Sequence, residues 1–420
     1  MAAYDVMIIG GGAAGLMAAA QLAGSGMRTL VLEQSDRVGR KLLATGNGRC
    51  NVLNMRMGRE RYFSHDMDMA MDILRAHDSK CILDVFMQMG LLTREEEDGR
   101  VYPLSGQAAS VLDTLRLTVQ ERGADIECQC AVTGIERAMG MWRARMSDGR
   151  TAEARRVVLA CGGRAQPTPP ADRQAHVDIY GMLKALGHKV YEPRPVLSAL
   201  RCDMSALRGL KGVRARCAMT LLDAGERRVL ARDEGEALFT DYGVSGIVAM
   251  QLSRALDGRS RAVLHIDLLP DMCEEEVRGM LRRRAASAAM RPLEGLMTGM
   301  LNRLLAQCVI RQAGLRAGDA SGDLDSPGIA ALAGALKHLR AEVLGAQDFK
   351  SAQVMRGGAA LSGFSGNLES KSAPGLYACG EVLDVDGECG GYNLMWAWAS
   401  ALTVAEGICA ERAARGVRRK

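Results

Sequence analysis

Three glycines near the N-terminus have the spacing of a phosphate-binding turn. Gly10, Gly12 and Gly15 form a GxGxxG pattern directly after the apolar run YDVMII. The first glycine of such a pattern allows a tight turn, the second lets a pyrophosphate approach the backbone, and the third lets a helix pack closely on the strand. A helix starting at Ala13 and Ala14 would direct its unpaired N–H groups at the phosphates. The turn therefore predicts a dinucleotide site.

An acidic residue follows at the distance that such a site requires. Glu33 and Gln34 end a second β-branched run, VLEQ, about 20 residues after the last glycine. A carboxylate at this strand end accepts hydrogen bonds from the ribose hydroxyls. We therefore expect a βαβ unit that binds a dinucleotide; a glycine turn used only for packing is the alternative.

The loop at residues 37–51, RVGRKLLATGNGRCN, favours FAD over NAD as the bound dinucleotide. A nicotinamide domain would enter another amphipathic helix here, whereas a larger and flatter cofactor needs backbone donors along its length. Arg40 and Lys41 either offset phosphate charge or lie on a solvated surface. The predicted cofactor contacts of this loop are Arg40, Lys41, Thr45, Gly46, Gly48, Arg49, Cys50 and Asn51.

Several further blocks give the chain a family resemblance. They include GRVYPLSGQAASVLDTL at 99–115, VVLACGG at 157–163, GEALFTDYGVSG at 235–246 and LESKSAPGLYACGEVLDVDGECGGYNLMWAW at 368–398. With these blocks in this order, the chain resembles the BaiN/YhiN-type, aminoacetone-oxidase-like family of FAD-dependent oxidoreductases. The resemblance implies an α/β fold: a glutathione-reductase-like Rossmann FAD domain interrupted by an inserted β-rich subdomain and a small helical subdomain.

The sequence pattern divides the chain in a way that agrees with that architecture. Residues 1–190 and 346–420 are expected to form a discontinuous FAD-binding domain. Alternating segments at 191–270, among them a predicted hairpin, indicate the β-rich subdomain. Helical patterns broken by glycine and proline at 271–345 indicate three or more packed helices.

The resemblance also implies cofactor contacts outside the first loop. Val132 approaches the adenine, Ala160, Gly162 and Gly163 lie at a strand end close to the cofactor, and Gly380 with Glu381 or Asp386 meets the ribityl chain. Gly390 and Gly391 open a helix directed at the flavin. The remaining predicted contacts are Gly391, Tyr392, Asn393 and Leu394.

No side-chain catalytic apparatus is evident, so the flavin itself is expected to carry the chemistry. The six histidines, at 65, 77, 176, 188, 265 and 338, show neither metal-ligand spacing nor an obvious nucleophile partner. Candidates near the ring are Asn47, Arg49, Cys50, Tyr392 and Asn393. Cys50 lacks a second cysteine a few residues on, which favours a structural or flavin-packing role over a redox disulfide.

The chain places two of its three tryptophans, Trp396 and Trp398, just after the glycine pair. Residues two apart on a helix do not share a face. One indole is therefore expected at the flavin or substrate cavity and the other in the core, with core packing of both as the alternative.

The resemblance leaves three functions open. We expect an NAD(P)H-using reductase of an activated C=C bond in a hydrophobic small molecule such as a bile-acid or steroid-like enone. No second strand-GxGxxG-helix unit is present, so NAD(P)H is predicted to dock only transiently as electron donor. The alternatives are an amine or aminoketone oxidase that produces hydrogen peroxide, and a flavin-bearing RNA-binding or RNA-modifying protein.

Four departures from the family pattern suggest a different substrate. They are Asp241, Ile247 and Met395, where His, Pro and Gln are common, and the segment PPADRQAHVDIYG at 169–181. We expect these positions to face the substrate, while cofactor binding persists.

Composition limits the partners of the chain. The net charge of +5 over 420 residues, with basic residues dispersed, predicts no stable nucleic-acid partner. Twelve scattered cysteines indicate neither a zinc module nor a disulfide scaffold, and a reducing cytoplasm is the simplest location. The N-terminus lacks the pattern of a signal peptide, and no run of about 20 apolar residues predicts a membrane span. A small-molecule substrate is expected, and the oligomeric state stays open.

Overall fold

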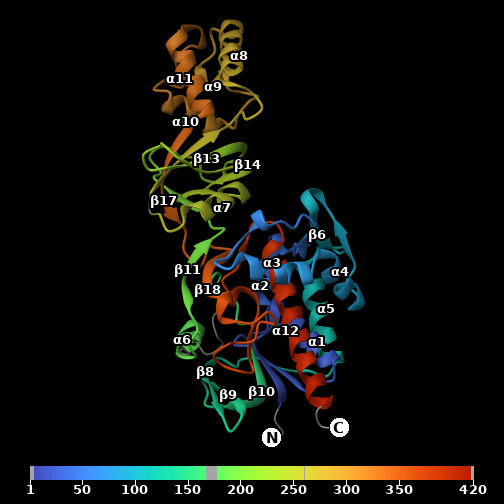
Figure 1. The fold of residues 1–420 in the computed structure, drawn as a ribbon. Coiled ribbons are helices and arrows are strands. Elements are labelled where there is room, and N and C mark those ends of the chain that lie inside the picture. The colour runs from blue at the N-terminus through green and yellow to red at the C-terminus, as the bar shows by residue number, and fades with distance from the viewer. Residues whose placement is uncertain (1–3, 167–176, 260, 418–420) are drawn as a thin grey trace. The chain divides into compact units, whose positions relative to one another are not determined.

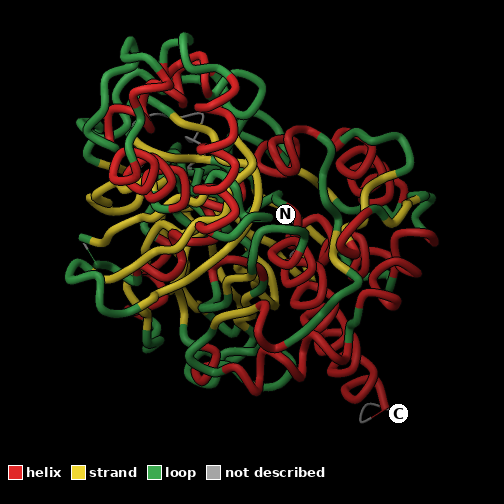
Figure 2. Tube along the Cα trace, turned by 90° about the horizontal axis from the view of Figure 1, so that it is seen from above, coloured by secondary structure: helices red, strands yellow, loops and turns green. Residues whose placement is uncertain are grey.

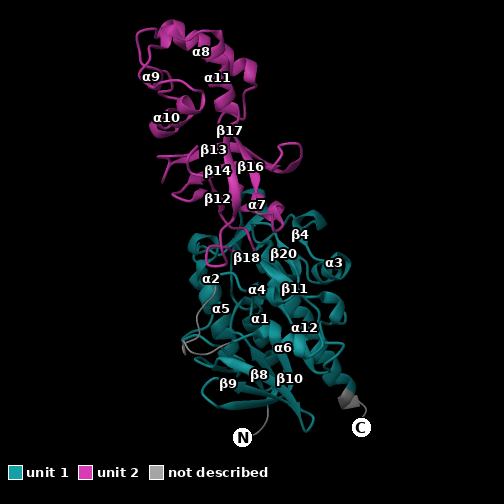
Figure 3. Cartoon of the chain, turned by 90° about the vertical axis from the view of Figure 1, so that its left-hand side faces the viewer, with its two compact units in different colours: residues 1–194, 354–420 teal, residues 195–353 magenta. Residues whose placement is uncertain are grey.

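The chain folds into two compact units in a computed structural model that describes residues 4–166, 177–259 and 261–417. Unit 1 comprises residues Met1–Arg194 and Val354–Lys420, and unit 2 comprises Pro195–Gln353 (Figure 3). The inserted unit thus begins and ends a few residues later than the limits of 191 and 345 expected from the sequence.

A mostly parallel sheet forms the centre of unit 1, with strands in the order β7-β2-β1-β10-β9-β8 and with β19 beside β10. Its strands are β1 (Tyr4–Ile9), β2 (Thr29–Leu32), β7 (Asp125–Glu127), β8 (Val132–Ala138), β9 (Met141–Met146), β10 (Thr151–Leu159) and β19 (Leu376–Ala378). The pairs β7–β2, β2–β1, β1–β10 and β10–β19 are all parallel. Parallel pairing in this strand order is typical of a doubly wound nucleotide-binding fold. The predicted fold class is confirmed.

Strand β10 pairs with two different strands along the same edge. Residues 151–154 pair antiparallel with β9, and residues 157–159 pair in parallel with β19. Strands β1 and β10 are apolar at their C-terminal ends and fully buried there, as expected for parallel strands covered on both faces. The carboxyl ends of β1, β10 and β19 therefore meet at one edge of the sheet.

The helices of unit 1 pack around one alanine-rich helix. Helix α1 carries the sequence AAGLMAAAQLAG, contacts both α5 and α12, and lies beside them in Figure 1. Small side chains allow this close packing on several sides. The long helix α12 leads to the C-terminal end of the chain (Figure 2). The helices are α1 (Ala13–Gly24), α2 (Arg40–Ala44), α3 (Met67–Ala76), α4 (Ser79–Gln88), α5 (Ala108–Glu121), α6 (Ile179–Ala185) and α12 (Tyr392–Val417).

Short strands complete unit 1 and connect it to the insertion. Strand β20 pairs with β4, β6 pairs with both β3 and β5, and β11 pairs with β18. They are β3 (Leu53–Asn54), β4 (Tyr62–Phe63), β5 (Thr93–Glu95), β6 (Arg100–Pro103), β11 (Val190–Val196), β18 (Val354–Ala359) and β20 (Asp386–Gly387). Single 3-10 turns across the chain are η1 (Thr45–Gly48), η2 (Arg59–Arg61), η3 (Glu97–Gly99), η4 (Arg254–Leu256), η5 (Ser321–Asp323), η6 (Leu361–Gly363) and η7 (Gly380–Val382).

Unit 2 consists of a closed barrel and a group of helices. The barrel order is β12-β15-β14-β13-β16-β17, and β13 and β14 form the predicted hairpin. The strands are β12 (Leu200–Cys202), β13 (Arg214–Asp223), β14 (Val229–Phe239), β15 (Gly243–Ser245), β16 (Ala262–Asp267) and β17 (Leu339–Ala346). The helices are α7 (Ile247–Ser253), α8 (Glu274–Ser287), α9 (Leu293–Leu296), α10 (Arg303–Gln312) and α11 (Ser326–Lys337).

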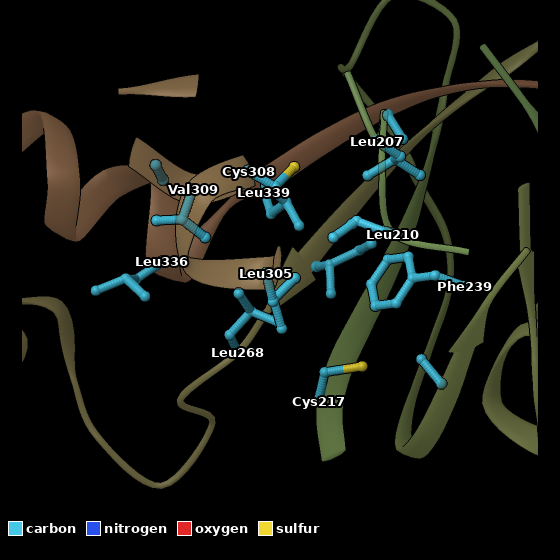
Figure 4. Packing of buried hydrophobic residues seen from close by; sticks show 14 of the residues in the cluster. Leu207, Leu210, Cys217, Phe239, Leu268, Leu305, Cys308, Val309, Leu336 and Leu339 are labelled. Carbon is cyan, nitrogen blue, oxygen red and sulfur yellow. The ribbon is translucent and has the colours of Figure 1, made fainter. Parts of the chain in front are cut away.

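The barrel and the helices of unit 2 share one hydrophobic core. Leu305 and Val309 of α10, Leu336 of α11 and Phe239 of β14 belong to the same buried cluster (Figure 4). The last barrel strand, β17, follows the helices in sequence. The expected separate β-rich and helical subdomains are therefore parts of a single unit, because the barrel closes only after the chain has passed through the helices.

A buried lysine joins the two parts of that unit. Lys337, in the last turn of α11, is 10% exposed and lies 2.7 Å from the Asp267 carboxylate at the end of β16. Its Nζ also donates to the carbonyl oxygens of Leu269 and Met272. The ammonium therefore compensates one half-buried carboxylate and two carbonyl groups.

Within the parts of the chain described, no helix has the length and apolar character that crossing a bilayer demands.

We predict that Lys337→Met weakens unit 2 by about 3 kcal/mol, because the Asp267 carboxylate and two carbonyls lose their donor in a buried site. Hydrogen exchange of amides in α11 and β16 should show faster opening. Lys211→Met is the matched control, since the Lys211–Asp241 pair is well exposed on both sides and contributes little. Equal protection of these amides in both variants would contradict the role assigned to Lys337.

Candidate functional site

The glycine turn between β1 and α1 leaves open space at one position only. A Cβ at Gly10, whose φ is +110°, would lie 2.4 Å from the Ala160 carbonyl oxygen, and one at Gly15 would lie 1.9 Å from the Gly10 oxygen. A Cβ at Gly12 would meet no atom within 4 Å. Two glycines are thus required by the protein's own packing, whereas the third opens onto free space at a helix N-terminus.

The N-terminus of α1 has donors to offer in that space. Gly12 is its N-cap residue, and no side chain caps the helix there. The first N–H groups of a helix lack partners within the helix and attract an anion. The turn has the shape and the donors that a diphosphate requires.

Glu33 follows β2 and is tied to this turn. Its Oε2 accepts the Gly11 N–H at 2.8 Å, and its Oε1 accepts the Ser35 N–H at 2.9 Å. The Ser35 hydroxyl is buried without a partner among the described residues. A buried hydroxyl without a partner is uncommon and fits a site for a ligand hydroxyl, such as that of a ribose.

The loop predicted to contact the cofactor contains two short helical turns, α2 and η1, rather than irregular backbone alone. Asn47 and Cys50 have φ values of 54° and 58°, in the left-handed region that side chains avoid. Such strain persists where the surrounding structure enforces it, often at binding sites. Burial raises the pKa of the Cys50 thiol to about 12, which disfavours a thiolate nucleophile and agrees with a packing role.

The charged residues of this loop divide into two groups. Lys41 lies 2.7 Å from Glu381 Oε2, whereas Arg40 pairs with Asp36 on the exposed surface. Arg49 pairs with Glu96 at 2.6 Å and stacks over the Tyr102 ring, where its guanidinium is already engaged. Of these predicted contacts, only Lys41 joins the segment that follows β19.

Glu381 brings together three distant parts of the chain. Its Oε1 accepts the Met355 N–H at 3.0 Å, and a Cβ at Gly163 would lie 2.9 Å from its carboxyl carbon. A Cβ at Gly380 would lie 3.0 Å from the Ala14 Cβ. The structure thus assembles the predicted residues Ala14, Lys41, Gly163, Gly380 and Glu381 around the carboxyl ends of β1, β10 and β19.

The second half of the site lies at the start of α12. A Cβ at Gly391, whose φ is +101°, would lie 2.6 Å from the Leu53 backbone and 2.9 Å from Asn51 Oδ1. Asn54 Nδ2 donates to the Gly390 oxygen at 2.9 Å. The Asn51 Oδ1 is buried and has no partner in the part of the chain that the structure describes. It therefore offers an acceptor for the N–H of a bound ring.

Several residues predicted to touch the flavin use their polar groups within the protein. Asn393 Oδ1 accepts the Gly387 N–H, and Asn393 Nδ2 donates to the Gly387 carbonyl oxygen. The Tyr392 hydroxyl donates to the Arg56 carbonyl oxygen. The Asp386 carboxylate pairs with Arg356 in a buried ion pair. Asn393 and Asp386 thus hold the turn that precedes α12.

Other predicted contacts are placed by backbone position alone. Val132 begins β8, Ala160 and Gly162 follow β10, and Leu394 lies half-buried in the first turn of α12. The remaining loop positions, Thr45, Gly46 and Gly48, all belong to η1.

Both tryptophans are core residues. Trp396 Nε1 donates to the Gly380 oxygen at 3.1 Å, and Trp398 Nε1 donates to the Val52 oxygen at 2.8 Å. Each is no more than 1% exposed. The two indoles leave α12 toward different segments and fix the two halves of the site to one helix.

The departures from the family pattern do not share one environment. Met395 is fully buried near Ser79, in contrast to the substrate-facing position expected. Asp241 pairs with Lys211, and Ile247 begins α7 with about half of its surface exposed, both in unit 2. Residues 167–176, which hold most of the segment at 169–181, lie outside the described residues.

A cluster around His65 was missed from the sequence. His65 Nδ1 lies 2.8 Å from Asp384 Oδ2, and its ring stacks on Tyr191 with centroids 3.6 Å apart. The Arg356 guanidinium lies over the ring of Phe63, two residues before His65, and pairs with the Asp386 carboxylate. The acids of EVLDVDG were visible in the sequence, but no spacing links residue 65 to residue 384.

Known proteins resemble this chain over nearly its whole length. The family model described as "HI0933-like protein Rossmann domain" matches residues 4–407. A 3-dehydro-bile acid delta(4,6)-reductase of Clostridium scindens is 33% identical over 401 residues, covering 94% of this chain and 96% of that protein.

Two ribosomal RNA dihydrouridine synthases are similar as well. The Haemophilus influenzae protein is 28% identical and covers 96% of this chain and 98% of its own length. The Escherichia coli protein is 26% identical and covers 98% of this chain and 100% of its own length. The chain therefore belongs to the HI0933-like Rossmann family, the BaiN/YhiN group of FAD-dependent oxidoreductases, as its sequence blocks predicted.

Proposed function

We propose that this FAD-dependent oxidoreductase reduces a C=C bond that is conjugated with a carbonyl group in a hydrophobic small molecule. One observation carries the proposal: the relatives differ in substrate but share one bond chemistry. A delta(4,6)-reductase of a 3-dehydro bile acid saturates double bonds conjugated with a ketone. Formation of dihydrouridine saturates a ring double bond next to a carbonyl. The similarity covers at least 94% of this chain in each case.

The described residues fit FAD at both ends of the site. The Gly12 space and the uncapped start of α1 would hold the diphosphate, and Glu33 with Ser35 would meet the ribose. Asn51 Oδ1 and the N-terminus of α12 would face the polar edge of the ring. Bound there, FAD supplies hydride transfer. The positive end of α12 stabilises negative charge on a neighbouring group.

We further propose NAD(P)H as a transient electron donor. Within the described residues, the parallel sheet of unit 1 is the one doubly wound sheet, and unit 2 is a barrel with helices. A donor without its own Rossmann domain must approach the site from solvent and leave again. This absence of a dedicated domain supports transient docking.

The substrate class has a second candidate, uridine in ribosomal RNA. Two of the three relatives are named for that reaction. The small molecule is preferred because the relative with the higher identity, at 33%, acts on a bile acid, and because the net charge of +5 is modest for an RNA-binding chain. None of these three relatives is named as an amine oxidase, so nothing specific favours that alternative.

We also place the protein in the cytoplasm. None of the twelve cysteines, all of which lie in described parts of the chain, forms a disulfide. Twelve cysteines with no disulfide among them suit a reducing compartment.

We predict that Gly12→Ala and Gly15→Ala separate cofactor binding from folding. Gly12→Ala should leave apoprotein stability nearly unchanged, because its Cβ meets no protein atom, yet weaken FAD binding about tenfold or more, or about 1.4 kcal/mol. Gly15→Ala should lower the melting temperature of the apoprotein, because its Cβ collides with the Gly10 oxygen. FAD titration and thermal unfolding measure the two effects. Unchanged FAD affinity in Gly12→Ala would contradict the phosphate site.

We predict that the reduced protein passes its electrons to an enone. Holoprotein reduced with dithionite under anaerobic conditions is mixed with 4-androstene-3,17-dione, and recovery of the oxidised flavin absorbance is followed. Rapid recovery supports the small-molecule proposal. Recovery only with an unmodified ribosomal RNA transcript would assign the second candidate. Recovery with neither substrate, but with oxygen and release of hydrogen peroxide, would refute both.

A further inference from the structure

Four separate segments of unit 1 contribute side chains to the cluster that contains His65. His65 follows β4, Asp384 precedes β20, Tyr191 lies on β11 and Arg356 lies on β18. The Asp384 N–H also bonds the Ala359 oxygen at the end of β18. The cluster is therefore built by long-range contacts rather than by a local turn.

A single carboxylate oxygen fixes the His65 imidazole. Asp384 Oδ2 accepts the His65 backbone N–H at 3.0 Å and lies 2.8 Å from Nδ1. Because a carboxylate only accepts, Nδ1 carries the proton of this bond. Stacking on Tyr191, with an interplanar angle of 9°, fixes the plane of the ring. The orientation of the opposite nitrogen, Nε2, is thereby fixed too.

The His65 Nε2 is available to a ligand. The side chain of His65 is 43% exposed, although that of Asp384 is only 2% exposed. No partner of Nε2 occurs among the described residues. A fixed ring with a solvent-accessible nitrogen is suited to proton transfer.

The segment that holds Asp384 also connects the two halves of the proposed FAD site. It starts at Gly380, against Ala14 of the glycine turn, and ends at Gly391, against Asn51. Asp384 lies between these points. His65 is therefore attached to the stretch of chain that would border FAD from its diphosphate end to its ring end.

Several charged side chains surround the imidazole. Asp384 faces it directly, and Asp386 is neutralised by Arg356, whose guanidinium lies 3.9 Å over the Phe63 ring. Lys189 Nζ lies 4.4 Å from the centroid of the Tyr191 ring, on which His65 stacks. Burial raises the pKa of the Asp384 carboxyl, while the N–H groups of His65 act in the opposite direction.

We infer that His65 is the catalytic acid of the reduction and that Asp384 is its positioning residue, an inference that rests on the proposed function. As the hydride that reduced FAD would supply forms a C–H bond at the β-carbon, the π electrons of the C=C bond form a second C–H bond at the α-carbon with the Nε2 proton, and the flavin would be left oxidised. Substrate gains two electrons and two hydrogens, and His65 is left neutral. Solvent then returns a proton to Nε2.

The first test compares His65→Gln with the wild type in single turnover. Reduced, anaerobic His65→Gln holoprotein should be reoxidised by 4-androstene-3,17-dione at least about 100-fold more slowly, the usual contribution of a general acid. Its flavin spectrum and FAD affinity should be unchanged. His265→Gln is the matched control, because His265 is also a partly exposed histidine, paired with Glu226 at 3.0 Å in unit 2, and its loss should leave the rate unchanged.

The second test does not depend on activity. ¹⁵N NMR of histidine-labelled holoprotein in alkaline buffer, with the His65 signal assigned by its loss in His65→Gln, should show neutral His65 with its proton on Nδ1. A proton on Nε2 would overturn the inferred geometry. The two failures are distinguishable: a wild type that no enone reoxidises refutes the proposed function, whereas an active wild type matched in rate by His65→Gln refutes the inference alone.

Discussion

The close approach of backbone at the carboxyl ends of β1 and β10 is the constraint on which unit 1 depends. Gly10 lies so near the Ala160 carbonyl, and Gly15 so near Gly10, that neither position admits a Cβ. This contact draws α1 onto the sheet and points its uncapped N-terminus at the strand ends. β19, more than 200 residues after β10 in the chain, must then return to the same edge. The binding site is a consequence of that closure.

The C-terminal part of unit 1 fixes both halves of the site to one helix. Trp396 and Ser400 of α12 hold the two backbone groups of Gly380, and Trp398 holds the Val52 oxygen beside Asn51. Because each bond is buried, loss of a partner would leave a polar group unsatisfied. The tryptophans therefore serve the geometry of the site through the core. Core packing of both indoles was one of the two roles that the sequence left open.

Local patterns were sufficient to predict the βαβ unit, the hairpin of the inserted part and the helix after Gly391, since each depends on residues close in sequence. Contacts between distant segments could not be predicted in this way. Lys41 meets Glu381, and His65 meets Asp384, across more than 300 residues, and no spacing encodes such pairs. The union of barrel and helices in unit 2 was hidden for the same reason, because β17 closes the barrel after four helices. Family resemblance supplied what spacing could not, the assignment to the FAD-dependent oxidoreductases.

The proposed chemistry of this protein is reduction of a conjugated C=C bond, with a proton delivered from a side chain. The most direct measurement is NMR of the product that the reduced holoprotein forms from 4-androstene-3,17-dione in D₂O without oxygen. The proposed chemistry predicts a saturated A ring with deuterium at the carbon next to the ketone. Recovery of unchanged steroid, with electrons passing only to oxygen once it is admitted, would contradict it.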